Sequence, residues 1–284
     1  MDPQLTWNVV ADVRQVLEFP FMVNAFRAGT IVAVLTGLVG WFMVLRKQSF
    51  AGHTLAVVGF PGAAGAVLIG ASAAYGLFTF AVAAALVIAL VPSGRADGFS
   101  EGSAVTGTIQ AFALACGFLF LSLYGGFLSS VNALLFGSFL GISSPQVLML
   151  LVAAIGALTV LAAIARPLLF ASVDADVAAA RGVPVRALSV GFLVLLGVAA
   201  AAASQITGTL LVFALLVVPA ATAQLLTPRP LLSVPLTVLL GVAITWLALF
   251  LAYFVDYPVG FFLTTVAFVA YLTAALGRKM VRRS

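Results

Sequence analysis

Residues 145–165 read PQVLMLLVAAIGALTVLAAIA, an apolar run without a single charged side chain. A helix needs about 20 predominantly apolar residues to cross the hydrocarbon core of a bilayer. Runs of similar character recur along the chain, and they start near residues 22, 52, 77, 103, 145, 187, 208, 231 and 259. The pattern predicts an all-α, polytopic membrane protein with about eight or nine transmembrane helices.

The composition excludes a soluble globular protein. Hydrophobic residues make up 64% of the 284 residues and charged residues only 7%, whereas soluble domains carry about 25% charged residues. The runs also lack the alternation that is typical of strands in an outer-membrane barrel. We therefore expect one membrane domain at 22–277, preceded by an interfacial segment at 1–21 and followed by a basic cytoplasmic tail at 278–284.

The basic residues lie between the apolar runs and are not gathered on one face, which argues against a nucleic-acid partner. With nine spans and an outside N-terminus, all of the 13 lysines and arginines except Arg14 and Arg27 fall on one side of the bilayer. The positive-inside rule makes that side cytoplasmic. It also predicts a cytoplasmic C-terminus.

Pro61 and Pro219 interrupt two of the apolar runs. A proline removes a helical hydrogen bond and frees a carbonyl, which is tolerated at membrane depth only where protein or a water-filled cavity satisfies it. Two interpretations stay open: the prolines are packing kinks, or they are breaks that line a transport pathway. Beside Pro61, the small residues Gly62, Ala66 and Gly70 have a spacing that lets another helix approach closely.

Four separated blocks point to one family. They read LRK at 45–47 leading into AGHTLAVVGFPG at 51–62, LFGSFLG at 135–141, VDADVAAARGVP at 173–184 and GTLLVFALLVVPAATA at 208–223. In this order and spacing they resemble the membrane permeases of zinc- and manganese-type ABC importers, over nearly the whole chain from about residue 22. The resemblance implies an ABC importer permease fold in the plasma membrane of a prokaryote.

The resemblance also implies partners. It predicts a homodimeric permease, powered by a separate cytoplasmic ATP-binding cassette ATPase and fed by an extracytoplasmic metal-binding protein. The sequence agrees on one point, because it has no G-x-x-x-x-G-K-[ST] loop and its two lysines, Lys47 and Lys279, lie in no glycine-rich loop. We expect a chain that is not an enzyme and holds no permanent cofactor, and that passes a divalent metal ion, zinc or manganese, with zinc slightly favoured.

The polar stretch from Asp174 to Arg186 resembles the family's coupling helix, which docks into the ATPase. Asp174 precedes an alanine run that it can cap. The residues alone favour an ordinary loop with a solvated helix, and the resemblance reverses this preference in favour of the coupling role. The candidate coupling residues are Asp174, Asp176, Arg181, Gly182 and Pro184.

The family's permeases usually carry an Asp and, four residues later on the same helix face, a His. In this sequence His53 fills the Asp position and Val57 fills the His position. An imidazole ligates divalent transition metals, whereas valine ligates none. Ionisable residues inside spans indicate function by default, so His53 is the candidate for the metal pathway. The alternative is a structural histidine near the cytoplasmic boundary.

Other side chains add weaker candidates. The candidates for lining the pathway are Pro61, Gly62, Ser138, Pro219 and Thr222, and further neutral side chains in the spans are Asn132, Ser204, Gln205, Thr207 and Gln224. Their polar groups either ligate the ion or join helices by hydrogen bonds, and the second role is favoured for most. Arg27 is either an outer gate residue or a snorkelling side chain, and snorkelling is favoured.

Two other functions compete with import by an ABC permease. A secondary transporter or channel works without an ATPase, but it usually needs carboxylates inside the membrane, and all eight acids here lie in loops or terminal segments. An intramembrane hydrolase with Ser138 as nucleophile and His53 as base lacks an activated-serine motif around Ser138. We therefore expect no catalytic residue.

Overall fold

The computed structural model describes residues 8–90, 98–124, 137, 141–209, 211–255 and 257–281, and these residues form helices and short connections without any strand. The helices follow one another along the chain as α1 (Val9–Leu17), α2 (Pro20–Leu45), α3 (Ser49–Leu68), α4 (Ala73–Leu90), α5 (Gly98–Leu123), α7 (Ser144–Val173), α8 (Ala175–Ala180), α9 (Val185–Thr207), α10 (Val212–Leu226), α11 (Pro230–Phe254) and α12 (Val259–Val281).

Eight of the described helices are long and apolar enough to cross a membrane, namely α2, α3, α4, α5, α7, α9, α11 and α12. α10 is also apolar, but its 15 residues give a length of about 22 Å, less than a hydrocarbon core of about 30 Å. Each predicted span has its helix, which begins within five residues of the predicted start. The all-α, polytopic fold with eight or nine membrane helices is therefore confirmed.

The main break in the helical pattern lies at a glycine and not at the two prolines. α3 runs unbroken through Pro61, and α10 runs unbroken through Pro219. The run expected to start near residue 208 instead forms a helix only from Val212, because Gly208 ends α9 with a φ of 74°. That value lies in the left-handed region, which glycine adopts without a steric penalty. Neither Pro61 nor Pro219 therefore ends a helix.

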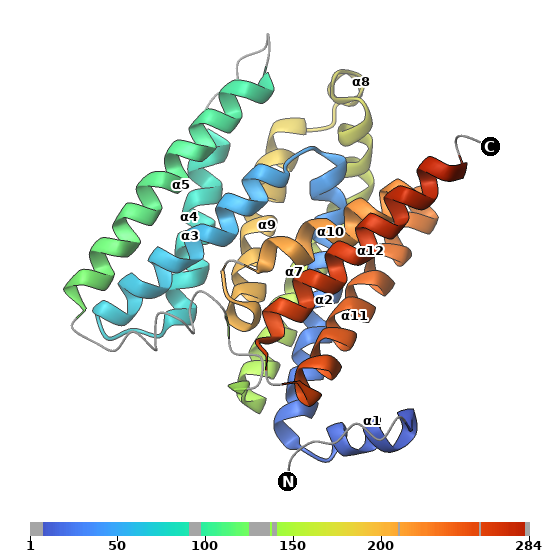
Figure 1. Ribbon diagram of the computed structural model, residues 1–284. Coiled ribbons are helices and arrows are strands. Elements are labelled where there is room, and N and C mark those ends of the chain that lie inside the picture. The colour runs from blue at the N-terminus through green and yellow to red at the C-terminus, as the bar shows by residue number, and fades with distance from the viewer. Residues whose placement is uncertain are drawn as a thin grey trace.

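Two groups of helices flank a central pair (Figure 1). α3, α4 and α5 pack together on one flank, and α10, α11 and α12 on the other. Between them, α2 contacts α7, α9, α10 and α11, while α9 contacts α3, α4 and α7. At least 67% of the span is buried in α2, α3 and α9, against 33% or less in the spans of α4, α5, α7, α11 and α12. The outer helices therefore present apolar faces to lipid or to another subunit.

The close approach of α3 and α4 depends on glycine at both helices. A Cβ placed on Gly62 would collide with the carbonyl oxygen of Gly76, and a Cβ on Gly76 would collide with the carbonyl oxygen of Gly62 and lie 2.8 Å from the Cβ of Ala66. The small-residue spacing at Gly62 and Ala66 thus serves helix packing, as predicted. Gly70 takes no part in this contact, since nothing lies within 4 Å of its Cβ position.

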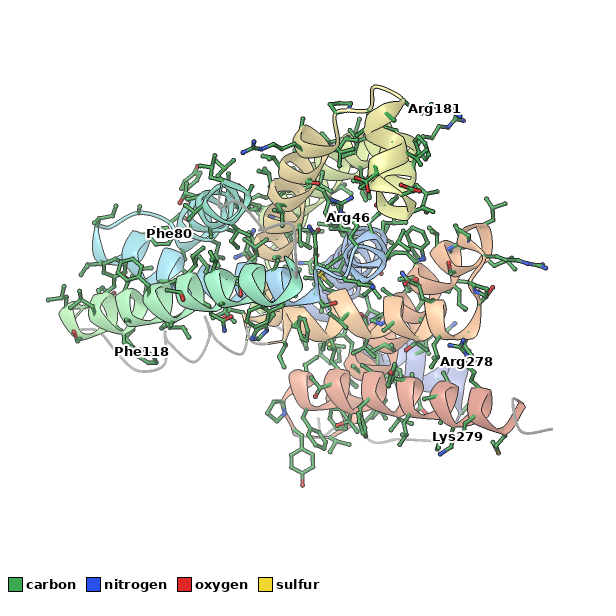
Figure 2. The ribbon with its side chains drawn as sticks, turned by 90° about the horizontal axis from the view of Figure 1, so that it is seen from above. Arg46, Phe80, Phe118, Arg181, Arg278 and Lys279 are labelled. Carbon is green, nitrogen blue, oxygen red and sulfur yellow. The ribbon has the colours of Figure 1, made fainter. Side chains whose placement is uncertain are left out.

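Basic residues mark one end of the molecule. Figure 1 shows α8 and the end of α12 at one end and α1 at the other. Figure 2 looks onto the first end, where Arg46, Arg181, Arg278 and Lys279 are labelled. Arg278 and Lys279 belong to the last turns of α12 and not to a separate tail, because this helix continues to Val281. Arg95 and Asp256 lie outside the described residues.

Candidate functional site

His53 lies about one turn into α3, the helix that follows the Arg46–Lys47 pair. Its imidazole makes an edge-on contact with the ring of Phe213 on α10, with 5.0 Å between the ring centroids. Its Nδ1 atom is buried and has no hydrogen-bond partner. A buried nitrogen without a partner is costly, so this atom is open to a further ligand. Whether His53 serves the metal pathway or is a structural histidine stays a prediction.

Two further buried polar atoms without a partner lie on segments that meet α3. They are Nε2 of Gln205, near the end of α9, and Oγ1 of Thr209, in the connection between α9 and α10. The methyl carbon of Thr209 lies 3.4 Å from the Cβ position of Gly59, and the hydroxyl of Ser204 lies 3.7 Å from it. Gly59 of α3 thus brings these segments close to that helix. The three helices α3, α9 and α10 contact one another, and we call the residues His53, Gln205, Thr209 and Phe213 on and between them the α3–α9–α10 junction.

The α3–α9–α10 junction is suited to a weak and transient ligand. No group of three or more His, Cys, Asp or Glu residues able to hold a metal ion occurs in the described part of the chain, so a closed metal cage is not formed there. The nitrogen and oxygen of a glutamine amide are assigned from their surroundings, so the unpartnered atom of Gln205 is either a donor or an acceptor. Val57, at the family's usual His position, is buried and offers no ligand atom.

Most of the neutral side chains are engaged within their own helices. The hydroxyls of Ser204, Thr207 and Thr222 each donate to the carbonyl four residues earlier, at 2.8, 3.1 and 2.7 Å. Gln224 is the exception, since its Nε2 donates to the carbonyl of Trp41 at 2.8 Å and so joins α10 to α2. The favoured role in helix joining thus fits Gln224, whereas the other three hydroxyls bond locally. Asn132 and Ser138 lie outside the described residues.

Pro61 and Pro219 do not face one common space. The Cα of Pro61 lies 3.2 Å from the Cβ position of Gly117 on α5, and the ring of Pro219 lies 3.8 Å from the Cβ position of Gly241 on α11. They therefore pack toward opposite flanks. A role for Pro61, Gly62, Pro219 and Thr222 in lining a pathway stays a prediction.

The coupling segment forms a short, exposed helix at the end of the molecule viewed in Figure 2. Asp174 caps α8, because its carboxylate accepts from the amide of Val177 at 2.9 Å. Gly182 ends the helix with a φ of 81°, while its amide donates to Ala179 at 2.9 Å and the amide of Val183 donates to Ala178 at 3.0 Å. This pair of bonds is a Schellman motif, which usually requires glycine at this position.

The two remaining acidic and basic candidates project from the same short helix. Asp176 lies in the first turn of α8 and Arg181 forms its C-cap, and both side chains are exposed. Pro184 precedes α9 directly as its N-cap residue. The coupling segment therefore connects α7 to α9 and forms an exposed helical turn that carries both acidic and basic side chains.

Arg46 links the helices on both sides of the coupling segment to α2, a role that the sequence did not predict. Its guanidinium donates to Ser172 of α7 at 3.0 Å and to Ser189 of α9 at 2.8 Å, and it lies 5.5 Å from the ring centre of Phe192. Burial lowers the pKa of Arg46, but an arginine starts from so high a value that it stays charged. Arg46 thus joins the end of α2 to the two helices that flank α8.

Comparisons with known proteins agree with this architecture. A family model described as the ABC 3 transport family matches residues 18–278. The manganese transport system membrane protein MntC of Halalkalibacterium halodurans is 31% identical over 228 residues, which are 80% of this chain and 77% of that protein. The chelated iron transport system membrane protein YfeC of Yersinia pestis is 29% identical over 262 residues, 92% of this chain and 87% of that protein.

A solved structure shares the fold. PsaBC from Streptococcus pneumoniae in complex with Fab superposes with a TM-score of 0.82 at 24% sequence identity, and the match covers 94% of this chain and 95% of that one.

The family match includes every helix from α2 to α11 and nearly all of α12. It therefore takes in both the α3–α9–α10 junction and the coupling segment. With eight helices able to cross a membrane, the protein is a multi-pass protein of the prokaryotic plasma membrane. The chain belongs to the ABC 3 transport family and is a membrane permease of a metal ABC importer.

Proposed function

We propose that this permease carries a divalent transition-metal ion into the cell through a passage lined by the α3–α9–α10 junction. The observation that supports this most is the set of buried, unpartnered polar atoms on His53, Gln205 and Thr209 in a chain of this family. Each such atom costs about 1–3 kcal/mol while it lacks a partner, and a passing ion supplies one. Because a single imidazole and neutral groups bind weakly, the ion is also able to leave again.

Manganese is the cargo that we propose first. The slight preference for zinc in the sequence analysis has no specific support from the relatives, which are named for manganese and chelated iron. Imidazole suits zinc, iron and copper, whereas carbonyl and water oxygens suit manganese. A passage that offers one imidazole and neutral amide and hydroxyl groups along its length is chemically compatible with manganese.

We infer that a cytoplasmic ATPase docks at α8 and that an extracytoplasmic metal-binding protein delivers the ion at the end where α1 lies. The basic residues at the α8 end support this orientation through the positive-inside rule, and the orientation makes the C-terminus cytoplasmic. We also propose a homodimer. α5 and α12 each bury only 17% of their spans, which leaves apolar faces for a second copy to cover.

The competing function, transport without an ATPase, has little to support it. The described acids Asp12, Glu18, Glu101, Asp174 and Asp176 all lie outside the candidate spans. Coupling to an ion gradient usually needs a carboxylate at membrane depth.

The proposal is tested by reconstituting the permease into vesicles with and without its ATPase and the metal-binding protein. We expect ATP-dependent accumulation of manganese in the complete system and none with the permease alone. Zinc and manganese are offered separately and then in competition, so that the same experiment ranks the two ions. Accumulation by the permease alone under an ion gradient would show that the chain is a secondary transporter.

The coupling role of α8 predicts the effect of replacing Gly182. Gly182→Val should weaken the Schellman motif, because a β-branched residue is strained at a positive φ, whereas Gly182→Asn should be tolerated better. We expect Gly182→Val to lower copurification of the ATPase and ATP-driven uptake several-fold, with normal insertion into the membrane. Gly191→Val on α9 is the control, since nothing lies within 4 Å of its Cβ position. Equal ATPase binding by all three variants would argue against the coupling role.

A further inference from the structure

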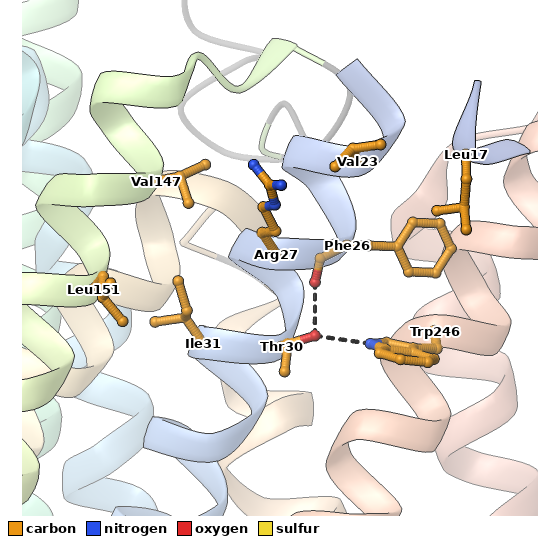
Figure 3. A pocket seen from close by; sticks show the side chains of 9 residues that line it. All are labelled: Leu17, Val23, Phe26, Arg27, Thr30, Ile31, Val147, Leu151 and Trp246. Atoms are coloured by element: carbon orange, nitrogen blue, oxygen red, sulfur yellow. Dashed lines mark hydrogen bonds between the residues drawn. The ribbon is translucent and has the colours of Figure 1, made fainter. Parts of the chain in front are cut away.

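An open groove of about 470 Å³ lies on the flank formed by α1, α2, α7 and α11. Its apolar walls include Val23 and Ile31 of α2 and Val147 and Leu151 of α7 (Figure 3). The volume is within the range of small-ligand sites, about 300–1,000 Å³. No lining residue belongs to α3, α9 or α10, so the groove is separate from the α3–α9–α10 junction.

Hydrogen bonds fix the walls of the groove relative to one another. The amide of Asn24 on α2 donates to the carbonyl of Ile142 at 3.2 Å and to the hydroxyl of Ser144 at 3.3 Å, which holds the start of α7. The indole of Trp246 on α11 donates to the hydroxyl of Thr30 at 2.8 Å, and that hydroxyl donates to the carbonyl of Phe26 at 2.7 Å. The groove is therefore preformed, and the polar groups of Thr30 and Trp246 already satisfy each other.

α1 covers one end of the groove. Leu17, at the end of α1, is one of the lining residues, and the ring of Phe19 contacts that of Tyr253 on α11 at 6.0 Å between centroids. Val10, Val13 and Leu17 are all exposed and share one side of α1 at helical spacing. A short helix with an exposed apolar side, lying across the end of the membrane helices, is typical of the membrane interface. The groove thus opens at the level where lipid headgroups begin.

Arg27 is the single charged residue that lines the groove. Among the described residues it makes no hydrogen bond or ion pair, and Figure 3 shows its guanidinium directed toward the beginning of α2. The 26 residues of α2 give a helix of about 39 Å, so the helix extends beyond a hydrocarbon core of about 30 Å. Snorkelling toward the start of α2, the favoured sequence interpretation, would bring the guanidinium of Arg27, the eighth residue of this helix, to the headgroup level.

We propose that this groove binds an acidic phospholipid, with one acyl chain between α2 and α7 and the phosphate on Arg27. In the orientation proposed above, this lipid comes from the outer leaflet. The planar guanidinium matches a phosphate with two parallel hydrogen bonds, and the apolar walls match a hydrocarbon chain. The lipid would fasten α1, α2, α7 and α11 at the end of the molecule opposite to α8.

The test compares three additives with the purified permease in detergent: phosphatidylglycerol, diacylglycerol with the same chains, and inorganic phosphate. Native mass spectrometry measures the retained lipid, and a melting curve measures stability. We expect phosphatidylglycerol alone to be retained and to raise the melting temperature, because only it has both the phosphate and the chains. An equal effect of inorganic phosphate, or of diacylglycerol, would overturn the proposal.

Variants test the phosphate contact and the acyl-chain contact of the groove separately. Arg27→Gln should lower phosphatidylglycerol retention more than about tenfold, because it removes two charge-assisted hydrogen bonds to the phosphate. Val147→Trp should block the acyl chain. Arg14→Gln is the matched control, because Arg14 lies on α1 at the same end but does not line the groove. Unchanged retention in Arg27→Gln, or cross-linking of a Val147→Cys variant to a second copy of the protein, would refute lipid binding. Uptake is not the readout, so these results are independent of the metal proposal.

Discussion

His53→Ala should reduce ATP-driven manganese uptake more than about tenfold, a loss typical of disturbed metal sites. The imidazole is the strongest ligand at the α3–α9–α10 junction, and its buried Nδ1 atom has no other partner. Removing it leaves only neutral amide and hydroxyl groups for the ion. Radiometal uptake into vesicles containing the full complex, at matched amounts of permease, measures the effect.

Three further variants make this result specific. His53→Asp should restore part of the uptake and shift the preference toward manganese, because a carboxylate is a harder ligand than imidazole. Gln205→Leu removes a neutral group of the same junction and should have a smaller effect in the same direction. Cys116→Ala is the control, since the thiol of this half-buried cysteine also binds transition metals but is not part of the junction. Wild-type uptake in His53→Ala would mean that the ion passes elsewhere.

The membrane helices were predictable because each is a nearly continuous apolar run whose length the bilayer dictates. The start of α10 was less predictable, since Gly208 continues an apolar run and its φ of 74° leaves no trace in hydrophobicity. Pro61 and Pro219 were candidates for helix breaks, but α3 and α10 continue through them. In this chain the backbone conformation at glycine decides where α9 ends.

The candidate site was predictable only in part. His53 was conspicuous as the single histidine, and Gln205 was recognised as a neutral candidate. Thr209 and Phe213 were not singled out, because they meet α3 only through tertiary packing, Thr209 at Gly59 and Phe213 at His53. Arg46 lay within a quoted block, but its bonds to Ser172 and Ser189 join residues more than 100 positions away, and no local pattern reveals them.

Gly76→Ala should strongly destabilise the permease, although alanine favours a helix over glycine by about 1 kcal/mol. The new methyl group would collide with the carbonyl oxygen of Gly62, and a backbone atom in the middle of a helix cannot move aside as a side chain does. Overpacking costs about 1–3 kcal/mol and occasionally more, so the collision outweighs the helical gain. We expect a lower melting temperature and a lower yield of folded protein in size-exclusion chromatography.

The reciprocal variant and a control show whether the α3–α4 contact is responsible. Gly62→Ala should be equally harmful, because its methyl group meets the carbonyl oxygen of Gly76 and approaches the Cβ of Phe80 to 2.7 Å. Gly156→Ala on α7 should be neutral or slightly stabilising, since nothing lies within 4 Å of its Cβ position. A melting temperature for Gly76→Ala equal to that of Gly156→Ala would mean that α3 and α4 are free to separate, and that glycine at this crossing is not needed for packing.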